Sequence, residues 1–165
     1  MDHFRTVLSP PPFPWQLDYE TPVLSLGSCF AEHLSQRLAE LKFPILNNPF
    51  GILYHPLVIA QALDRLLDGP PYPRDSLFVQ QDLWRHFDFH SRYAHPDRDT
   101  ALAVINEQLA QGQVFLSSTR LLILTLGTAW GYRLVSDDSL VANCHKLPAG
   151  KFRRYRSTTT EIVEG

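Results

Sequence analysis

The sequence predicts an α/β fold in three layers, in which helices cover both faces of a parallel sheet. Two apolar segments, Pro22–Leu26 and Arg120–Leu126, each end in a glycine followed by a hydroxyl residue, as expected for buried strands that stop at a tight turn. The second run is continuously apolar, which is typical of a strand buried on both faces. Helical patterns alternate with these strands, and this alternation indicates right-handed crossovers within a parallel sheet. The strand ends at Ser28 and Gly127-Thr128 are therefore expected side by side on one edge.

The first strand leads into a predicted helix over 31–42. Its apolar positions recur at helical spacing, at Phe30, Leu34, Leu38 and Leu41. Phe43-Pro44 ends the helix, because a residue before proline avoids the helical region. The next strand, Ile45–Tyr54, is interrupted by Asn48-Pro49 and Gly51, which predict a loop beside the strand end.

A second helix is expected to begin at Pro56 and to end at Asp68-Gly69. Residues 70–95 are irregular and rich in aromatic and histidine side chains, which is more typical of a functional loop than of a linker. His95-Pro96-Asp97 opens a third helix, which Gln111-Gly112 is expected to close.

The remaining segments are a predicted hairpin, a basic tail and an N-terminal arm. Tyr132–Val135 and Ser139–Ala142 form the hairpin around Asp137-Asp138. The basic segment Lys151–Arg156 is interpreted as a solvated face that leads into a helix within Ser157–Glu164. The proline-rich residues 1–21 are expected to form an extended arm, and residues 22–165 form the domain.

The composition excludes several functional classes. The 165 residues are 44% hydrophobic and 19% charged, as in a globular protein with one core. A net charge of −2 gives no electrostatic argument for nucleic acid or an anionic membrane as a partner. No apolar run approaches the roughly 20 residues of a membrane span. The N-terminus lacks the apolar core of a secretory signal, and two cysteines make no disulfide framework, so we expect a cytoplasmic setting.

Ser28 is the candidate nucleophile. It follows a strand and a glycine and precedes a helix, whose free N–H groups and positive dipole end would face a developing oxyanion. The alternative is that Ser28 only caps the helix. Cys29 is either a second nucleophile or a small buried residue. His86 and His90 are four residues apart, but no carboxylate spacing completes a metal site, so neither a metal nor a cofactor is expected.

Five motifs occur in the order seen in the GSCFA family, which the chain resembles from about Pro22 to its end. They are Gly27-Ser28-Cys29-Phe30-Ala31, Asn48-Pro49-Phe50-Gly51-Ile52-Leu53-Tyr54, Asp88-Phe89-His90-Ser91, Thr125-Leu126-Gly127-Thr128-Ala129-Trp130 and Asn143-Cys144-His145-Lys146. That family is similar to the SGNH, or GDSL-like, hydrolases. The resemblance implies a flavodoxin-like sheet and hydrolysis or transfer of an acyl ester, with a small-molecule or carbohydrate ester as substrate.

The resemblance also implies roles for particular residues. Ser28 matches the nucleophile, and its N–H and that of Gly51 match two oxyanion donors. The superfamily usually has an asparagine two residues after the third-block glycine, where this chain has Ala129. Thr128 or Asn143 is therefore expected to supply the third donor.

The general base is the main departure from the superfamily pattern. SGNH enzymes carry an Asp-x-x-His motif near the C-terminus, and none follows Ser28 here. We therefore expect the base outside this chain, the C-terminal part of the domain to be missing, and this portion alone to be inactive. His90 and His145 are candidates for a base or a substrate ligand, or each bonds a loop backbone. Asp88 either orients a histidine or is a solvated carboxylate.

A second hypothesis is a non-catalytic module that binds a carbohydrate or an acyl group. In this case the pocket remains but a base is lacking. An incomplete sheet would also expose an edge, which favours self-association.

Overall fold

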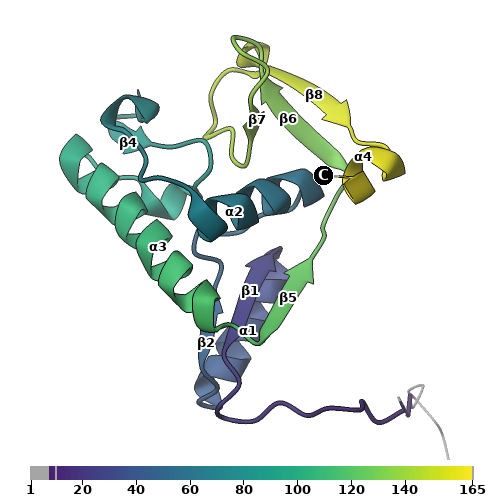
Figure 1. Ribbon diagram of the computed structural model, residues 1–165. Helices are drawn as coiled ribbons and strands as arrows, with labels where there is room; N and C mark the ends of the chain where they lie inside the picture. The colour runs from purple at the N-terminus through teal and green to yellow at the C-terminus, as the bar shows by residue number, and fades with distance from the viewer. Residues whose placement is uncertain (1–7, 10, 165) are drawn as a thin grey trace, which may run out of the picture.

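A computed structural model describes residues 8–9 and 11–164 of the chain, and it contains a small parallel sheet (Figure 1). Its strands are β1 (Val23–Gly27), β2 (Ile45–Asn47) and β5 (Leu121–Thr125), in the order β2-β1-β5. In the β1–β5 register, Val23 is opposite Leu121 and Gly27 is opposite Thr125. The predicted α/β class is confirmed, and the two apolar strands end at the same edge.

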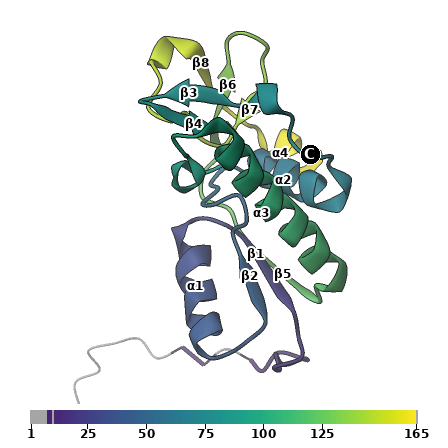
Figure 2. The ribbon, with the colours of Figure 1, turned by 90° about the vertical axis from the view of Figure 1, so that its left-hand side faces the viewer.

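Helices lie on both faces of this sheet. Figure 2 shows α1 (Cys29–Glu40) on one face and α3 (Arg98–Ser118) on the other, with α2 (Pro56–Asp68) beside α3. Leu24 and Leu26 of β1 point to the α3 side, where they join the buried cluster completed by residues of α2 and α3. Successive strand residues point to opposite faces, so Val23 and Ser25 face α1. The buried residues of α1 are small, Ala31 and Ser35, and this lets the helix approach the sheet closely.

The predicted end of the third helix at Gly112 is wrong, because α3 continues to Ser118. Gly112 is buried against α2, and a Cβ at this position would overlap the side chain of Leu66. The glycine therefore serves helix–helix packing rather than helix termination. The N-terminus matches the prediction, since the Asp97 side chain caps α3 by accepting a hydrogen bond from the Thr100 N–H (2.8 Å).

Two antiparallel units extend from the carboxyl edge of the parallel sheet. The irregular region contains the pair β3 (Phe78–Gln80) and β4 (Leu83–Arg85), and short 3-10 helices at Arg74–Ser76 and Ser91–Tyr93. The predicted hairpin is confirmed as β6 (Trp130–Leu134) and β7 (Leu140–Val141). After a 3-10 turn at Ala149–Lys151, β8 (Phe152–Arg156) pairs with β6, and α4 (Thr159–Glu164) follows.

One segment is a strand that the sequence analysis does not predict, and one strand prediction needs correction. The basic segment Lys151–Arg156 contains β8, and its four charged side chains are exposed, as expected of a solvated face. The segment around β5 is not buried on both faces, since the exposed fractions of Leu122 and Leu124 are 39% and 43%. β5 is one of the two edge strands of this sheet (Figure 1), and its side chains Leu122 and Leu124 are only partly covered. An apolar run therefore indicates a strand but not how completely it is covered.

The predicted arm over residues 1–21 lies partly outside the described residues, which exclude 1–7, 10 and 165. Its described part, residues 8–9 and 11–21, contains no helix or strand. The domain boundary at residue 22 stays a prediction. Among the described helices, none has the length and apolar character needed to cross a membrane.

Candidate active site

Ser28 lies at the turn between β1 and α1. Gly27 adopts a φ of 141°, and a Cβ at this position would overlap the backbone and side chain of Thr125, so glycine is required here. Ser28 is half-buried and occupies the N-cap position of α1, but its side chain makes no capping hydrogen bond. Its hydroxyl instead faces the end of β5. Helix capping, the alternative role of Ser28, therefore does not explain the position of its side chain.

Thr125 holds both polar groups of Ser28. The Ser28 N–H donates to Thr125 Oγ1 (2.9 Å), and the two hydroxyl oxygens are 3.0 Å apart. This pair orients the Ser28 hydroxyl at the sheet edge. It also occupies the Ser28 N–H, so an oxyanion at Ser28 would have to compete with Thr125 Oγ1 for that donor. Among the described residues, no histidine is hydrogen-bonded to Ser28 Oγ.

Asn48 connects the Ser28 turn to the loop that follows β2. Its side-chain Oδ1 accepts a hydrogen bond from the Gly27 N–H (2.8 Å), and its own N–H donates to Ser25 O (2.8 Å). On the other side of the turn, the Leu53 N–H donates to Gly27 O (2.8 Å). The residue before Ser28 is thus held through both backbone polar groups. This clamp explains why the turn and the Asn48–Tyr54 motif lie together.

Gly51 packs directly against His90. Its φ is 85°, and a Cβ at this position would overlap the Cβ of His90. The Gly51 N–H donates to Asn48 O (2.7 Å), which closes a turn, and the His90 N–H donates to Phe50 O (2.8 Å). Two motifs about 40 residues apart in the chain therefore meet here, although the Gly51 N–H is already occupied.

The His90 ring is neutral and its tautomer is defined by the loop. Its Nδ1 accepts a hydrogen bond from the Arg92 N–H (3.2 Å), so the ring proton is on Nε2. Burial lowers the pKa of His90, and the nearby Arg92 lowers it further. Arg92 also pairs with Glu32 of α1 (2.6 Å), which ties this loop to the helix that begins after Ser28.

The segment after β5 packs against Tyr54. The Tyr54 carbonyl accepts hydrogen bonds from the N–H groups of Gly127 (2.9 Å) and Thr128 (3.1 Å). The Thr128 hydroxyl accepts one from the Trp130 N–H (3.1 Å). Burial raises the pKa of the Tyr54 phenol, and neighbouring Cys29 raises it further. Gly127-Thr128 therefore lies against the Asn48–Tyr54 motif.

Asn143 and His145 lie on the loop after β7 and have different roles. The Asn143 Oδ1 accepts a hydrogen bond from the His145 N–H (2.8 Å). His145 is buried, with 4% of its surface exposed, and its Nε2 donates to His86 O (2.8 Å), while Nδ1 has no partner among the described residues. Burial lowers the pKa of His145 to about 4. His145 therefore bonds a loop backbone, as one of the two alternatives predicted.

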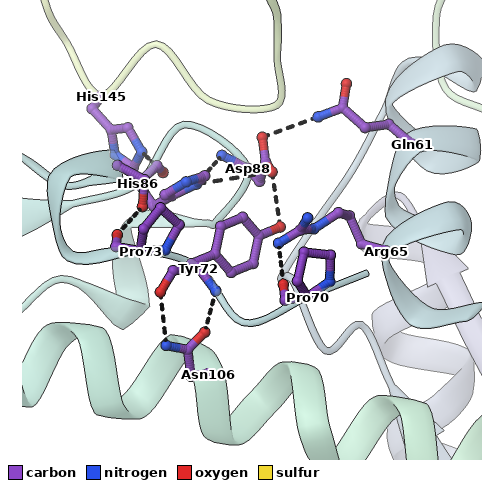
Figure 3. A network of polar contacts seen from close by, with 10 residues as sticks. Gln61, Arg65, Pro70, Tyr72, Pro73, His86, Asp88, Asn106 and His145 are labelled. Carbon is purple, nitrogen blue, oxygen red and sulfur yellow. Dashed lines mark hydrogen bonds and ion pairs between the residues drawn. The ribbon is translucent and has the colours of Figure 1, made fainter. Parts of the chain in front are cut away.

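Asp88 belongs to a separate polar network that anchors the irregular region (Figure 3). Its two carboxylate oxygens accept hydrogen bonds from the Tyr72 hydroxyl (2.8 Å) and the Gln61 side chain (3.0 Å). Its histidine neighbour is His86, with Nδ1 3.9 Å from Oδ2. Asn106 of α3 bonds both backbone polar groups of Tyr72 (2.7 and 3.1 Å). Asp88 is thus not a solvated carboxylate, and the histidine that it contacts is His86, whose Nδ1 accepts a hydrogen bond from the Asp88 N–H (3.0 Å).

A cavity of about 700 Å³ adjoins this edge of the sheet. Its walls come from the loop after β2, the His90 loop, the loop after β7, and one face of β6 and β8. The lining residues are Ile52, Tyr54, His90, Tyr132, Ala142, Asn143, Cys144, Leu147, Ala149, Phe152 and Arg154. The candidates His90 and Asn143 line this cavity, whereas Ser28, Gly51 and Thr128 are not among its lining residues. A volume of this size and mostly apolar walls are typical of a small-molecule site.

Sequence reasoning missed two residues that hold the candidate nucleophile, Thr125 and Asn48. Thr125 is the one hydroxyl residue within the apolar run of β5, and this polar interruption is the signal that marks it. The sequence predicts Asn48 only as a turn former, although its φ of 44° and full burial make it a structural clamp. Within the described residues, no cluster of three histidine, cysteine or acidic side chains could hold a metal ion.

Comparison with known proteins gives one match. The GSCFA family model matches residues 22–165, which is most of the chain. No curated protein and no solved structure matches the sequence.

Proposed function

The chain belongs to the GSCFA family, and from this premise we propose that it is a serine esterase or acyltransferase with Ser28 as nucleophile. Ser28 Oγ attacks the carbonyl carbon of an ester and its proton passes to a general base. The carbon–oxygen bond to the alcohol then breaks, and the alcohol leaves with that proton. Water or a second alcohol attacks the acyl-enzyme and releases Ser28. The observation that carries the proposal is the half-buried Ser28 hydroxyl at the strand end, oriented by Thr125.

The strand order supports a flavodoxin-like sheet as the wider fold. β5 is the third parallel strand along the chain, so β2-β1-β5 corresponds to the order 2-1-3 with which such sheets begin. In sheets of this kind, ligands bind outside the carboxyl ends of the strands. Ser28 is at that end of β1, and the loop that bonds to this turn through the Leu53 N–H also lines the cavity, with Ile52 and Tyr54.

The oxyanion donors in this proposal are the N–H groups of Ser28 and Gly51 and the amide of Asn143. In the described structure, Thr125 Oγ1 and Asn48 O accept from the first two. A substrate oxyanion carries more charge than either acceptor and forms stronger hydrogen bonds, so it would displace them. The Asn143 Oδ1 accepts from the loop backbone, which holds the amide in place at the cavity wall and leaves its nitrogen as the donor in this proposal.

The general base in this proposal lies outside the described residues. His90 lines the cavity, but the bonded partner of its Nδ1 is Arg92, and His145 is buried in its loop. A serine hydroxyl without a base reacts slowly at neutral pH. If the Ser28 hydroxyl is accessible and oriented for attack, an added base should therefore increase its reactivity.

The test is covalent labelling with a fluorophosphonate probe, with and without added imidazole. We expect imidazole to accelerate labelling of the 165-residue chain and of Cys29→Ala, and to have no such effect on Ser28→Ala. Peptide mapping should locate the label on Ser28. Labelling that is absent in every condition, or equal in Ser28→Ala, contradicts the proposal.

The cavity favours a second candidate function, a non-catalytic binding module for a carbohydrate or acyl group. In the described structure, the Ser28 and Gly51 N–H groups are both engaged while the cavity is formed. This candidate predicts ligand binding without labelling of Ser28. Fluorophosphonate labelling of Ser28 and ligand binding to the cavity, measured on the same protein, therefore distinguish the two functions.

A further inference from the structure

We infer that the cavity lined by His90, Asn143 and Arg154 binds a small amphiphile that carries an anionic group, with Arg154 as the residue that recognises the anion. This inference concerns binding and holds for either of the two candidate functions above. For an ester substrate, it would place a carboxylate or phosphate on the substrate in addition to the ester.

The cavity walls are mostly apolar. Ile52, Leu147 and Phe152 provide aliphatic and aromatic surface, and Tyr54 and Tyr132 add aromatic rings. Walls of this kind stabilise the apolar body of a ligand by removing its surface from water. No aspartate or glutamate lines the cavity among the described residues.

The polar side chains of the cavity comprise one cation and several neutral groups. Arg154 is the cation, and the neutral groups are His90, Asn143, the hydroxyls of Tyr54 and Tyr132 and the thiol of Cys144. Because burial lowers the pKa of His90, its ring is uncharged at neutral pH and can donate from Nε2. A ligand anion in this cavity would therefore meet a positive charge and hydrogen-bond donors, with no lining carboxylate to repel it.

Arg154 is held in place but lacks an acidic partner among the described residues. Its guanidinium carbon lies 4.1 Å from the centroid of the Trp130 ring, on the neighbouring strand β6. Stacking on an aromatic face orients a guanidinium and leaves its N–H edges free for a carboxylate or phosphate. Arg153, the preceding residue, faces the other side of β8 and is paired with Asp138. Arg153 therefore already has an acidic partner, whereas Arg154 has none among the described residues that would compete with a ligand anion.

The experiment compares ligands of equal chain length by isothermal titration calorimetry below their micelle-forming concentrations. The probes are decanoate, decyl phosphate, 1-decanol and decylammonium. We expect decanoate or decyl phosphate to bind about fivefold to tenfold more tightly than 1-decanol, and decylammonium to bind most weakly. The better of the two anions identifies carboxylate or phosphate as the recognised group. Added salt should reduce the difference between anion and alcohol.

Matched variants assign the effect to Arg154. Arg154→Met keeps an apolar stem and should reduce anion binding to the level of 1-decanol, whereas Arg153→Met should leave the preference for the anion intact. Ala149→Trp places a large side chain at the cavity wall from an exposed position and should weaken all probes. Circular dichroism melts verify that each variant is folded.

Several outcomes would overturn the inference. These are equal binding of anion and alcohol, equal loss in Arg153→Met and Arg154→Met, full binding in Ala149→Trp, or no binding of any probe. The failure of the esterase proposal looks different, since Ser28→Ala is expected to retain anion binding whether or not Ser28 is ever labelled.

Discussion

The buried imidazole of His145 should make the protein sensitive to acid. Its pKa is about 4 in the folded protein against 6.5 for an ordinary histidine, so the unfolded chain takes up a proton at a higher pH than the folded protein does. A group with a depressed pKa in the fold stabilises the protein above the unfolded value. This stability is lost as the pH falls from about 6.5 towards 4, because the unfolded state binds more protons.

The magnitude follows from the same two values. A gap between 6.5 and about 4 is worth about 3.4 kcal/mol when fully expressed, at 1.36 kcal/mol for each pH unit. At pH 4 the folded imidazole is itself half protonated, so about 3 kcal/mol is lost between pH 7 and pH 4. A loss of this size is a large fraction of the free energy of unfolding of a typical domain.

The measurement is urea unfolding of the wild type and His145→Gln at pH 7 and pH 4. Between pH 7 and pH 4, the free energy of unfolding should fall by about 3 kcal/mol less in His145→Gln than in the wild type. His55, His86 and His90, whose pKa values burial also lowers, are present in both proteins. Lys146→Gln, on the same loop, should keep the full wild-type loss. Equal losses in the wild type and His145→Gln would refute the assignment of a buried neutral imidazole.

Three further substitutions test the packing around Ser28. Gly51→Ala should lower the free energy of unfolding by about 2 kcal/mol or more in urea melts, because the new Cβ overlaps His90 and the φ of 85° disfavours alanine. Thr125→Val should cost about 1–2 kcal/mol by the same assay, because the Ser28 N–H loses its acceptor. Ser35→Ala should raise the melting temperature, with a gain of about 1 kcal/mol, because the buried hydroxyl of Ser35 has no partner among the described residues.

Matched controls separate these effects from general sensitivity to mutation. Gly150→Ala should be nearly neutral, since nothing lies within 4 Å of the position that its Cβ would occupy. Thr125→Ser keeps the hydroxyl and should retain most of the stability that Thr125→Val loses. A Gly51→Ala variant that is as stable as the wild type, or a Ser35→Ala variant that is less stable, would show that the local packing differs from the structure described here.

Much of the parallel unit could be predicted from local pattern. The apolar strand, the glycine turn and the helical spacing after Ser28 specify β1 and α1, and Pro56 marks the start of α2. Local pattern failed at Gly112, because a glycine inside a helix serves the approach of a neighbouring helix that the local sequence does not contain. It failed in a similar way at β5, where the covering of Leu122 and Leu124 depends on the other elements of the fold.

The sequence by itself determined the family and the residue types of the candidate site, since both are properties of order along the chain. Only the tertiary structure decided which of these residues meet. Thr125 reaches Ser28 because the β1–β5 register places it opposite Gly27, nearly 100 residues away in the chain. Register, burial and hydrogen-bond partners are set by packing between distant segments, and for this reason they decided that His90 lines the cavity while His145 and Asp88 serve the loops.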